Sequence, residues 1–426
     1  MEKLDLLDVN TDGDVYLAAP GVSDAGGSQL LTPKRPATEK AGAADAFPYY
    51  AGFSFDWACS KLQRIEDPSR VVLDPWNGSG TTTLAAQTIG LRSVGIDLNP
   101  VANKIAQLRS QVNRDAPILS SPGQSSLRVD KNDGLHSWFT EPTAARIRDW
   151  TRCIAQKSEG DAGLALVAIF RAVRKATKSF EGSNPTWVKQ AKSVDELIDI
   201  GVAELDAAIV LEQEFLADRL SSLPMAVAPT ALFTASANSL PLRDESIDVI
   251  LTSPPYLTRI DYAVAYAREL AILGVNITRD RTLRTRLMGT TLTRKEVDLT
   301  FDRFGPRSQT LLRAISEHKS KASGGYYLKQ AVQYLSDLNQ GVAELSRVAR
   351  DGADLHLVVQ DSYYKDVPVP LADICIEEAE VRGWHLVECK PYPVKRNLTK
   401  LNTSARAYKK GDVAETVISF KKGRHG

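Results

Sequence analysis

Between residues 71 and 97 the chain runs through an apolar segment, a glycine-bearing turn, a helical segment and a second apolar segment. The first apolar segment, VVLD, covers 71–74 and leads directly into the turn PWNGSG. The following TTTLAAQTIG has the composition of a helix that ends at Gly90, and SVGID then ends at Asp97. Strand, glycine turn, helix and strand in this order open a doubly wound unit. We therefore predict an α/β fold with a largely parallel sheet.

Further periodic segments divide the chain into a core and two insertions. Additional strand signals are ALFTAS, IDVILTS, ADLHLVVQ, HLVECKPY and ETVISFKK, whereas the segment before ALFTAS shows helical apolar spacing and the segment after IDVILTS is basic and partly helical. We expect a flexible leader at 1–45, core segments at 46–111, 227–262 and 351–426, a helical insertion at 112–226 and a basic, partly helical insertion at 263–350.

Composition excludes several classes of protein. Of the 426 residues, 43% are hydrophobic and 25% are charged, which argues against a disordered or fibrous chain. No run approaches the roughly 18 apolar residues of a membrane span, and the acidic start MEKLDLLDVNTDGD lacks the apolar core of a signal peptide. We expect a cytoplasmic protein with no membrane partner. The cysteines lack metal-ligand spacing, which predicts reduced, mostly buried thiols and no metal site: Cys59, Cys153, Cys375 and Cys389.

The glycine turn is a candidate binding loop. Gly78 and Gly80 allow a sharp turn and a close approach of the backbone to a ligand, and the helix start that follows favours an acidic ligand group. Asp97 lies 23 residues after Asp74, where the acceptor of ribose hydroxyls lies in this topology. A plain tight turn and a helix-capping Asp97 are the alternatives. No G-x-x-x-x-G-K-[ST] motif occurs, which disfavours nucleotide hydrolysis.

A second candidate site follows the strand segment IDVILTS. The sequence TSPPY covers 252–256, and its two prolines end the strand and make the backbone rigid. That rigidity presents the Ser253 hydroxyl and nearby carbonyls at the carboxyl edge of the sheet, beside the aromatic ring of Tyr256. Acceptors next to a flat ring suit a planar base that carries an exocyclic amine. The alternative is that the two prolines only end the strand and begin a loop, without a role in binding.

Taken together and in this order, DPWNGSGT, GIDLNP and TSPPY resemble the S-adenosylmethionine-dependent DNA amino-methyltransferases. The resemblance covers about 47–105 and 230–262, and 354–420 more loosely. It implies a Rossmann-like methyltransferase sheet with helices on both faces, S-adenosylmethionine as cofactor and no metal. Ser236 stands where the family usually has an acidic residue that contacts the adenine amine. The cofactor residues that the resemblance implies are Phe53, Asp74, Trp76, Asn77, Gly78, Gly80, Thr81, Asp97, Leu98 and Ser236.

The resemblance also implies the reaction. The target base is flipped out of the duplex and stacked on Tyr256, while the Ser253 hydroxyl and the Pro254 carbonyl accept hydrogen bonds from its amine. The implied catalytic residues are Ser253, Pro254, Pro255 and Tyr256. In the family SPPY is commoner among cytosine-N4 enzymes, so we favour cytosine N4 and keep adenine N6 as the alternative. An RNA amino-methyltransferase and a catalytically silent DNA-binding subunit also remain open, whereas ring-carbon methylation is disfavoured because no Pro-Cys occurs.

Charge is uneven along the chain although its net value is only +1. Residues 259–329 hold 14 Lys and Arg against 7 Asp and Glu, a net of +7, and residues 390–426 hold 10 against 2, a net of +8. Local basic stretches suit contact with a polyanion, although solvated faces are the alternative. The implied partner is double-stranded DNA, and a restriction endonuclease encoded alongside is left open. We expect phosphate contacts from Arg279, Arg281, Arg284, Arg286, Arg294 and Lys295.

Two further basic clusters are candidates for DNA contact. One consists of Arg171, Arg174, Lys175 and Lys178 within the helical insertion, which is a candidate DNA-recognition region, and the other of Lys395, Arg396 and Lys400. Trp187 follows the first cluster in GSNPTW, and we expect it to be a core residue rather than a base contact. The order of motifs does not decide which insertion recognises DNA.

Overall fold

The computed structural model describes residues 31–35, 46–47, 49, 52–110, 117–123, 128–157, 159–182, 184, 186–221, 227–257, 260–393 and 414–424. The expected leader at 1–45 lies outside the described residues except for 31–35. The basic cluster of Lys395, Arg396 and Lys400 also lies outside them.

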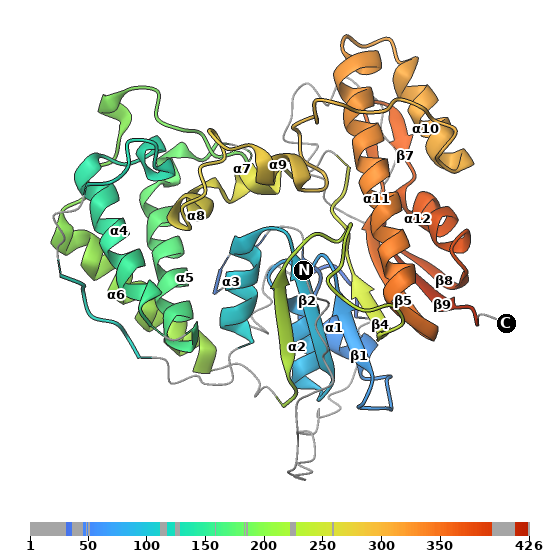
Figure 1. Ribbon diagram of the computed structural model, residues 1–426, viewed down its shortest axis with the longest axis horizontal. Coiled ribbons are helices and arrows are strands. Elements are labelled where there is room, and N and C mark those ends of the chain that lie inside the picture. Colours follow the sequence, from blue (N-terminus) through green and yellow to red (C-terminus); the bar gives the residue numbers. More distant parts are fainter. Residues whose placement is uncertain are drawn as a thin grey trace.

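A mixed sheet forms the centre of the molecule (Figure 1). Within the described residues it has seven strands in the order β3-β2-β1-β4-β5-β9-β8. The first five along the chain are parallel, and β9 runs antiparallel to both of its neighbours, β5 and β8. The predicted α/β fold is confirmed. The strands are β1 Val71–Asp74, β2 Arg92–Asp97, β3 Thr230–Thr234, β4 Ile247–Thr252, β5 Ala349–Gln360, β8 Trp384–Pro393 and β9 Ala414–Lys422.

Helices cover both faces of this sheet because buried side chains alternate along its strands. Val72 and Val249 pack with helices α1 (Phe55–Leu62) and α2 (Thr81–Thr88) on one face. Their neighbours Leu73 and Ile250 pack on the other face with three helices: α10 (Pro306–Ser316), α11 (Leu328–Val348) and α12 (Leu371–Glu380).

Helix α11 was expected inside an insertion but belongs to the core. Its face from Leu328 to Val348 is buried in the same cluster as β4 and β5. The high content of Lys and Arg in 263–350 predicted a surface insertion, yet most of those cations lie outside α11. The apolar face of α11 recurs at helical spacing, and that periodicity decides its place against the sheet.

The predicted helical insertion forms a second apolar core beside the sheet, on the left in Figure 1. Helices α4 (Glu141–Ala155), α5 (Glu159–Ala176) and α6 (Val202–Ser221) pack there with α8 (Ala267–Ile272). Ion pairs within this core join Arg174 to Glu269 at 2.8 Å and Arg268 to Glu181 at 2.9 Å. The start of the predicted basic insertion is therefore anchored on the helical one.

Short elements complete the fold and correct two expectations. Trp187 is 48% exposed, so its expected core position is wrong, and of the four cysteines only Cys375 is buried. In the part of the chain that the structure describes, no helix has both the length and the apolar character to cross a bilayer. The remaining elements are α3 Pro100–Arg109, α7 Tyr262–Ala265, α9 Thr282–Arg286, the hairpin strands β6 Ser362–Tyr364 and β7 Val367–Val369, and the short helices η2 Gly134–Ser137, η3 Lys178–Phe180, η4 Val194–Glu196 and η5 Ser323–Tyr327.

Candidate functional site

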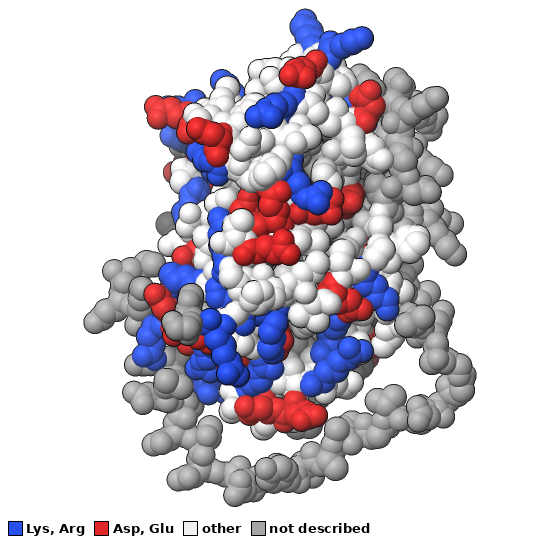
Figure 2. Space-filling view, turned by 90° about the vertical axis from the view of Figure 1, so that its right-hand side faces the viewer, with Lys and Arg blue, Asp and Glu red and all other residues white. Residues whose placement is uncertain are grey.

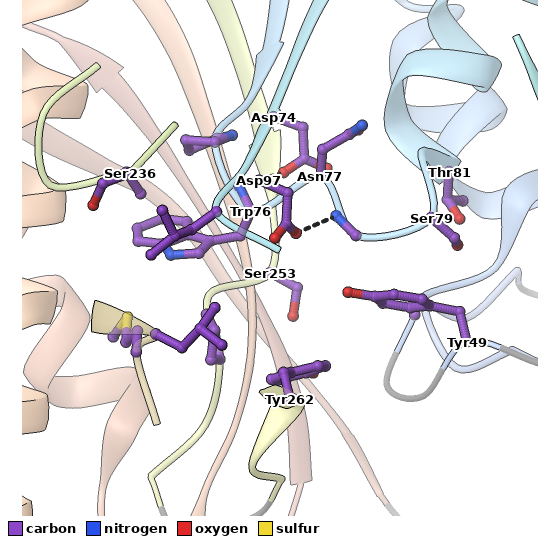
Figure 3. A pocket seen from close by; sticks show the side chains of 18 of the residues that line it. Tyr49, Asp74, Trp76, Asn77, Ser79, Thr81, Asp97, Ser236, Ser253 and Tyr262 are labelled. Atoms are coloured by element: carbon purple, nitrogen blue, oxygen red, sulfur yellow. Dashed lines mark hydrogen bonds between the residues drawn. The ribbon is translucent and has the colours of Figure 1, made fainter. Parts of the chain in front are cut away.

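A pocket lies at the carboxyl ends of β1, β2 and β4 (Figure 3). The strand order reverses between β1 and β4, which is where doubly wound sheets bind ligands. We call it the main pocket, and its volume, including the part that is open to solvent, is about 850 Å³. Its lining consists of Tyr49, Gly52, Phe53, Asp74, Pro75, Trp76, Asn77, Gly78, Ser79, Thr81, Asp97, Leu98, Ser236, Ala237, Asn238, Ser253, Pro255, Tyr262, Arg286, Leu287 and Met288.

One side of the main pocket, which we call the first wall, comes from 74–81 and 97–98. The backbone N–H of Gly78 donates to Oδ2 of Asp97 at 2.9 Å, and the N–H of Asn99 donates to Oδ1 at 2.8 Å. Gly78 has a φ of +53°, and a Cβ there would lie 2.8 Å from the ring of Tyr49. The turn therefore requires glycine at this position, both for its backbone angle and for the close ring.

Asp74 connects the first wall to the rest of the sheet. Its carboxylate accepts from the hydroxyls of Thr82 at 2.5 Å and Thr252 at 2.6 Å, which belong to α2 and β4. The N–H of Trp76 donates to the same carboxylate at 3.1 Å. Burial raises the pKa of Asp74 to about 6, although the two hydroxyls oppose this shift. Asp74 therefore holds β1 and β4 together at the point where the pocket opens.

Asp97 is the carboxylate of the first wall that faces the pocket (Figure 3). Burial raises its pKa to about 6, and the N–H groups of Asn99 and Gly78 lower it by stabilising the anion. Each oxygen accepts one backbone hydrogen bond, and a carboxylate oxygen has a second lone pair. Asp97 can therefore accept further hydrogen bonds from a ligand that bears hydroxyl groups.

The opposite side, which we call the second wall, comes from 236–238, Ser253, Pro255, Tyr262 and 286–288. Ser253 lies in the pocket, and its hydroxyl is 3.3 Å from that of Tyr256. The hydroxyl of Tyr334, on α11, donates to the carbonyl of Pro255 at 2.9 Å. The rigid proline turn is thus held by the core helix behind it.

Two buried carboxylates anchor the second wall. Asp261 accepts from Arg284 at 2.9 Å and from the N–H of Thr291 at 3.0 Å. Asp337 accepts two hydrogen bonds from Arg294, at 2.9 and 2.8 Å, and one from the amide of Asn238 at 3.1 Å. Each carboxylate is only 4% exposed. These pairs join segments distant in sequence and determine where Asn238 and residues 286–288 lie.

Aromatic rings close the pocket between the walls. Tyr49 stacks on Tyr266 with ring centres 5.1 Å apart and planes 18° apart, and on Tyr262 at 6.2 Å and 23°. Tyr49 and Tyr262 both point toward the pocket in Figure 3. Burial raises the pKa of Tyr49 well above its usual value, so its hydroxyl stays protonated. The stack extends to the helical insertion, because the Arg174 guanidinium lies 5.3 Å over the Tyr266 ring.

Most of the expected site residues line the main pocket. They are Phe53, Asp74, Trp76, Asn77, Gly78, Thr81, Asp97, Leu98, Ser236, Ser253 and Pro255. Gly80, Pro254 and Tyr256 are adjacent in sequence to lining residues but do not line the pocket themselves. Arg286, expected at phosphates, does line it. Lining residues that were not predicted include Tyr49, Asn238, Tyr262, Leu287 and Met288, of which the first three lie within the ranges 47–105 and 230–262 that the resemblance covers.

The six cations of 279–295 fall into two groups. Arg284 and Arg294 are paired with Asp261 and Asp337, so their predicted phosphate contact is replaced by a structural role. The other four are exposed, namely Arg279, Arg281, Arg286 and Lys295. The pattern of charges in the sequence could not separate the two groups, because the partners Asp261 and Asp337 lie outside the segment.

The cations expected to bind DNA on α5 also have protein partners. Arg171 and Lys175 both pair with Glu212 of α6, and Arg174 pairs with Glu269 of α8. Their place between helices explains why basic residues recur along α5. Among the described residues, no group of three or more His, Cys, Asp or Glu side chains is arranged to hold a metal ion.

Comparison with known proteins gives four matches. The family model described as DNA methylase matches residues 48–108. Over 384 residues, 80% of this chain and 78% of the relative, the sequence is 25% identical to the type II methyltransferase M.AvaI of Nostoc sp.. It is also 25% identical to the type II methyltransferase M.BsoBI of Geobacillus stearothermophilus over 58% of this chain, and this match spans 56% of that relative's length. A solved S-adenosylmethionine-dependent methyltransferase from Methanosarcina mazei aligns over 86% of this chain and 98% of its own, with 9% identity and a TM-score of 0.31.

Proposed function

Because the chain carries a DNA methylase segment and is similar to DNA amino-methyltransferases, we propose that it transfers a methyl group from S-adenosylmethionine to an exocyclic amine of a base in double-stranded DNA. The main support for the proposal is that two sequence motifs line the same pocket. Asp97 with its glycine loop and Ser253 with its prolines are far apart in sequence but line one pocket. A cofactor site and an amine-binding turn are thus within reach of each other.

The first wall suits S-adenosylmethionine. Asp97 supplies a carboxylate for ribose hydroxyls, and the glycine turn brings backbone N–H groups close to the pocket. Phe53, Trp76 and Leu98 add apolar surface for the rest of the molecule. Ser236 and Asn238 line the second wall, and Ser236 stands where the resemblance implies an acidic residue at the adenine amine. When bound, the cofactor supplies an electrophilic methyl group.

The second wall supplies the groups that act on the amine. The Ser253 hydroxyl and the Pro254 carbonyl accept hydrogen bonds from its N–H groups, which aims the nitrogen lone pair across the pocket. The hydroxyl of Tyr256 lies 3.3 Å from that of Ser253, which is a long hydrogen bond that an incoming amine can replace. The substituted amine is cationic and strongly acidic, so this chemistry requires no strong base from the protein.

Cytosine N4 is the base position that we favour, because the motif is Ser253-Pro254-Pro255-Tyr256 rather than one that begins with Asp or Asn. Adenine N6 is the second candidate. The two relatives are named type II methyltransferases, and on this likeness we include a restriction–modification or DNA-marking role in the proposal.

Mass spectrometry of nucleosides tests the proposal directly. DNA and RNA are incubated separately with the full-length protein and S-adenosylmethionine that carries a deuterated methyl group, then digested. We expect labelled N4-methylcytosine from DNA. Labelled N6-methyladenine would keep the reaction and change the base, label on RNA alone would change the polymer, and no label on either would overturn the enzymatic role.

A further inference from the structure

A second pocket lies on the helical insertion, away from the main pocket. Three segments form it: η2 with the residues before it, residues 190–191, and the loop 276–279 that leads into α9. We call it the insertion pocket. Its lining residues are polar except for one alanine: Lys131, Asn132, Asp133, His136, Ser137, Gln190, Ala191, Asn276, Thr278 and Arg279.

Hydrogen bonds between the three segments hold the insertion pocket in shape. The amide of Gln190 donates to the hydroxyl of Thr278 at 2.9 Å, and the amide of Asn276 donates to the carbonyl of Asn132 at 2.8 Å. The N–H of Thr278 donates to the side chain of Asn276 at 3.1 Å. Polar side chains from distant parts of the chain therefore converge on one opening.

The charge that the insertion pocket presents is positive. The carboxylate of Asp133 accepts two hydrogen bonds from Arg148, at 2.6 and 2.7 Å, so its charge is neutralised within the protein. His136 lies 3.3 Å from the carboxylate of Glu141. Lys131 and Arg279 are exposed, and neither has an ion pair among the described residues. Two cations with hydroxyl and amide donors beside them match the oxygens of a phosphate group.

A line of cations connects this pocket to the main one. Arg279 lines the insertion pocket, and Arg286, at the end of α9, lines the main pocket. Arg281 is exposed between them, and the carboxylate of the neighbouring Asp280 accepts the N–H of Thr282. Because the segment starts in a turn and continues as a helix, the helical rise gives a span of roughly 10 Å, which corresponds to about three nucleotides of one strand. Figure 1 shows α9 crossing between the helical insertion and α11.

The opposite side of the molecule has a different charge pattern. Figure 2 shows the face with α10, α12 and β8, where acidic side chains gather across the middle and basic ones gather below them. Arg307 of α10 pairs with Asp373 of α12, and Lys421 of β9 pairs with Asp354 of β5. The acidic band would repel a polyanion, whereas Arg281 and Arg286 of the α9 segment are exposed and have no ion pair among the described residues.

We propose that the insertion pocket binds the phosphodiester backbone of DNA a few nucleotides from the target base, and that residues 279–286 carry the strand from there to the main pocket. This inference rests on the proposed function, which supplies DNA as the substrate. It gives the helical insertion a role in holding the duplex and makes Lys131, Gln190 and Arg279 DNA contacts that lie outside the methyl-transfer site.

Salt dependence of DNA binding tests this site. Fluorescence anisotropy of a 40-base-pair duplex of mixed sequence is recorded over a range of NaCl concentrations for the wild type and the double variant Lys131→Ala/Arg279→Ala. Each lost phosphate contact lowers the slope of log K against log salt by about 0.9, so we expect a slope shallower by about 1.8 and an affinity lower by about 10- to 60-fold at 0.1 M. The affinity for S-adenosylmethionine, measured by calorimetry, should not change.

A matched control removes two exposed cations elsewhere. Lys319→Ala/Lys321→Ala lies beyond α10, far along the chain from both pockets, and should leave slope and affinity unchanged. An unchanged slope in the first double variant, or an equal loss in the control, would overturn the proposal. If the wild type binds DNA with this pattern but never labels it, the proposed reaction fails and the binding site stands.

Cross-linking gives a second test that does not depend on loss of affinity. A photoreactive benzoylphenylalanine replaces Gln190, and a second protein carries it at Glu317 as the control. After irradiation with DNA that contains a methylated site, we expect covalent adducts from position 190 alone, within about six nucleotides of the methylated base. Adducts scattered along the duplex, or none from position 190, would contradict the proposed track.

Discussion

The two walls of the main pocket are built in different ways. The first wall comes from the two ends of one strand–helix–strand unit, 74–81 and 97–98, and is held by backbone hydrogen bonds to Asp97. The second wall comes from segments spread between residues 236 and 288 and depends on two buried carboxylates, Asp261 and Asp337. A change at Asp97 should therefore act mainly on cofactor affinity. A change in the second wall should act on folding stability and turnover.

The largest effect should follow the loss of an anchor in the second wall. Asp261→Ala leaves Arg284 without its carboxylate and removes the acceptor of Thr290 and Thr291. Breaking a buried ion pair by removing one partner costs about 3–5 kcal/mol, so we expect a clear drop in the urea midpoint of unfolding. Glu296→Ala, which removes an exposed carboxylate from a neighbouring segment, should leave the midpoint unchanged. Equal midpoints for the two variants would refute the anchoring role.

The next effect should come from the first wall and change a different quantity. Asp97→Ala removes the proposed acceptor of ribose hydroxyls, and hydrogen bonds to a charged group contribute about 1.5–3 kcal/mol. We expect the dissociation constant of S-adenosylmethionine to rise about 10- to 150-fold in calorimetry. Asp97→Asn keeps one acceptor oxygen and should recover part of the affinity. An unchanged constant in Asp97→Ala would remove this residue from the cofactor site.

Tyr256 follows Pro255 of the second wall, and its hydroxyl lies 3.3 Å from that of Ser253, so it tests the role of the proline turn apart from the two carboxylate anchors. Tyr256→Ala removes the proposed stacking surface for the base, and stacking contributes about 1–3 kcal/mol per base. We expect kcat/KM for DNA to fall about 10- to 100-fold while cofactor affinity stays at the wild-type value. Tyr256→Phe keeps the ring and should retain most of the activity. Full activity of the alanine variant would refute base stacking at this position.

The smallest effect is a dependence of cofactor binding on pH. Burial raises the pKa of Asp97 to about 6, and only the ionised carboxylate accepts fully from ribose hydroxyls. Affinity should therefore be constant above pH 7 and weaken about tenfold by pH 5. For folding the sign is reversed, since a raised carboxylate pKa favours the native state at low pH and this contribution is lost as pH rises through 6.

The variant Asp97→Asn assigns this titration. Asp74 has a pKa of about 6 for the same reason, so both carboxylates change charge in one range. We expect a flat profile of cofactor affinity between pH 5 and 7 for Asp97→Asn. A profile that still falls below pH 6 would assign the dependence to Asp74.

Sequence reasoning succeeded where backbone chemistry is local. The strand 71–74, the turn with Gly78 and the strand ending at Asp97 were predicted from neighbouring residues alone, and the structure has β1, α2 and β2 at these places. The end of β4 before Ser253 was equally visible because prolines cannot continue a sheet. In such segments the residue types determine the backbone directly, so no distant partner is needed.

Predictions from the sequence failed where contacts with distant segments determine whether a residue is buried or exposed. In the sequence, Arg284 and Arg294 cannot be distinguished from the exposed arginines near them. In the structure, they form ion pairs with Asp261 and Asp337. Helix α11 lies in a basic stretch, 263–350, that we predicted to be an insertion. It packs on the sheet because its apolar face and the apolar face of the sheet bury each other. Tyr262 and Asn238 lie outside the three motifs DPWNGSGT, GIDLNP and TSPPY. They line the pocket because contacts with other segments hold them there.

By itself, then, the sequence determined the order of strands and helices, the glycine turn and the two motifs at the strand ends, since each depends on contacts within a few residues. Only the tertiary structure decided which cations remain exposed, which aromatic rings close the pocket and which insertion lies beside it. These features depend on burial and charge pairing between segments distant in the chain, and neither property belongs to a residue until the chain has folded.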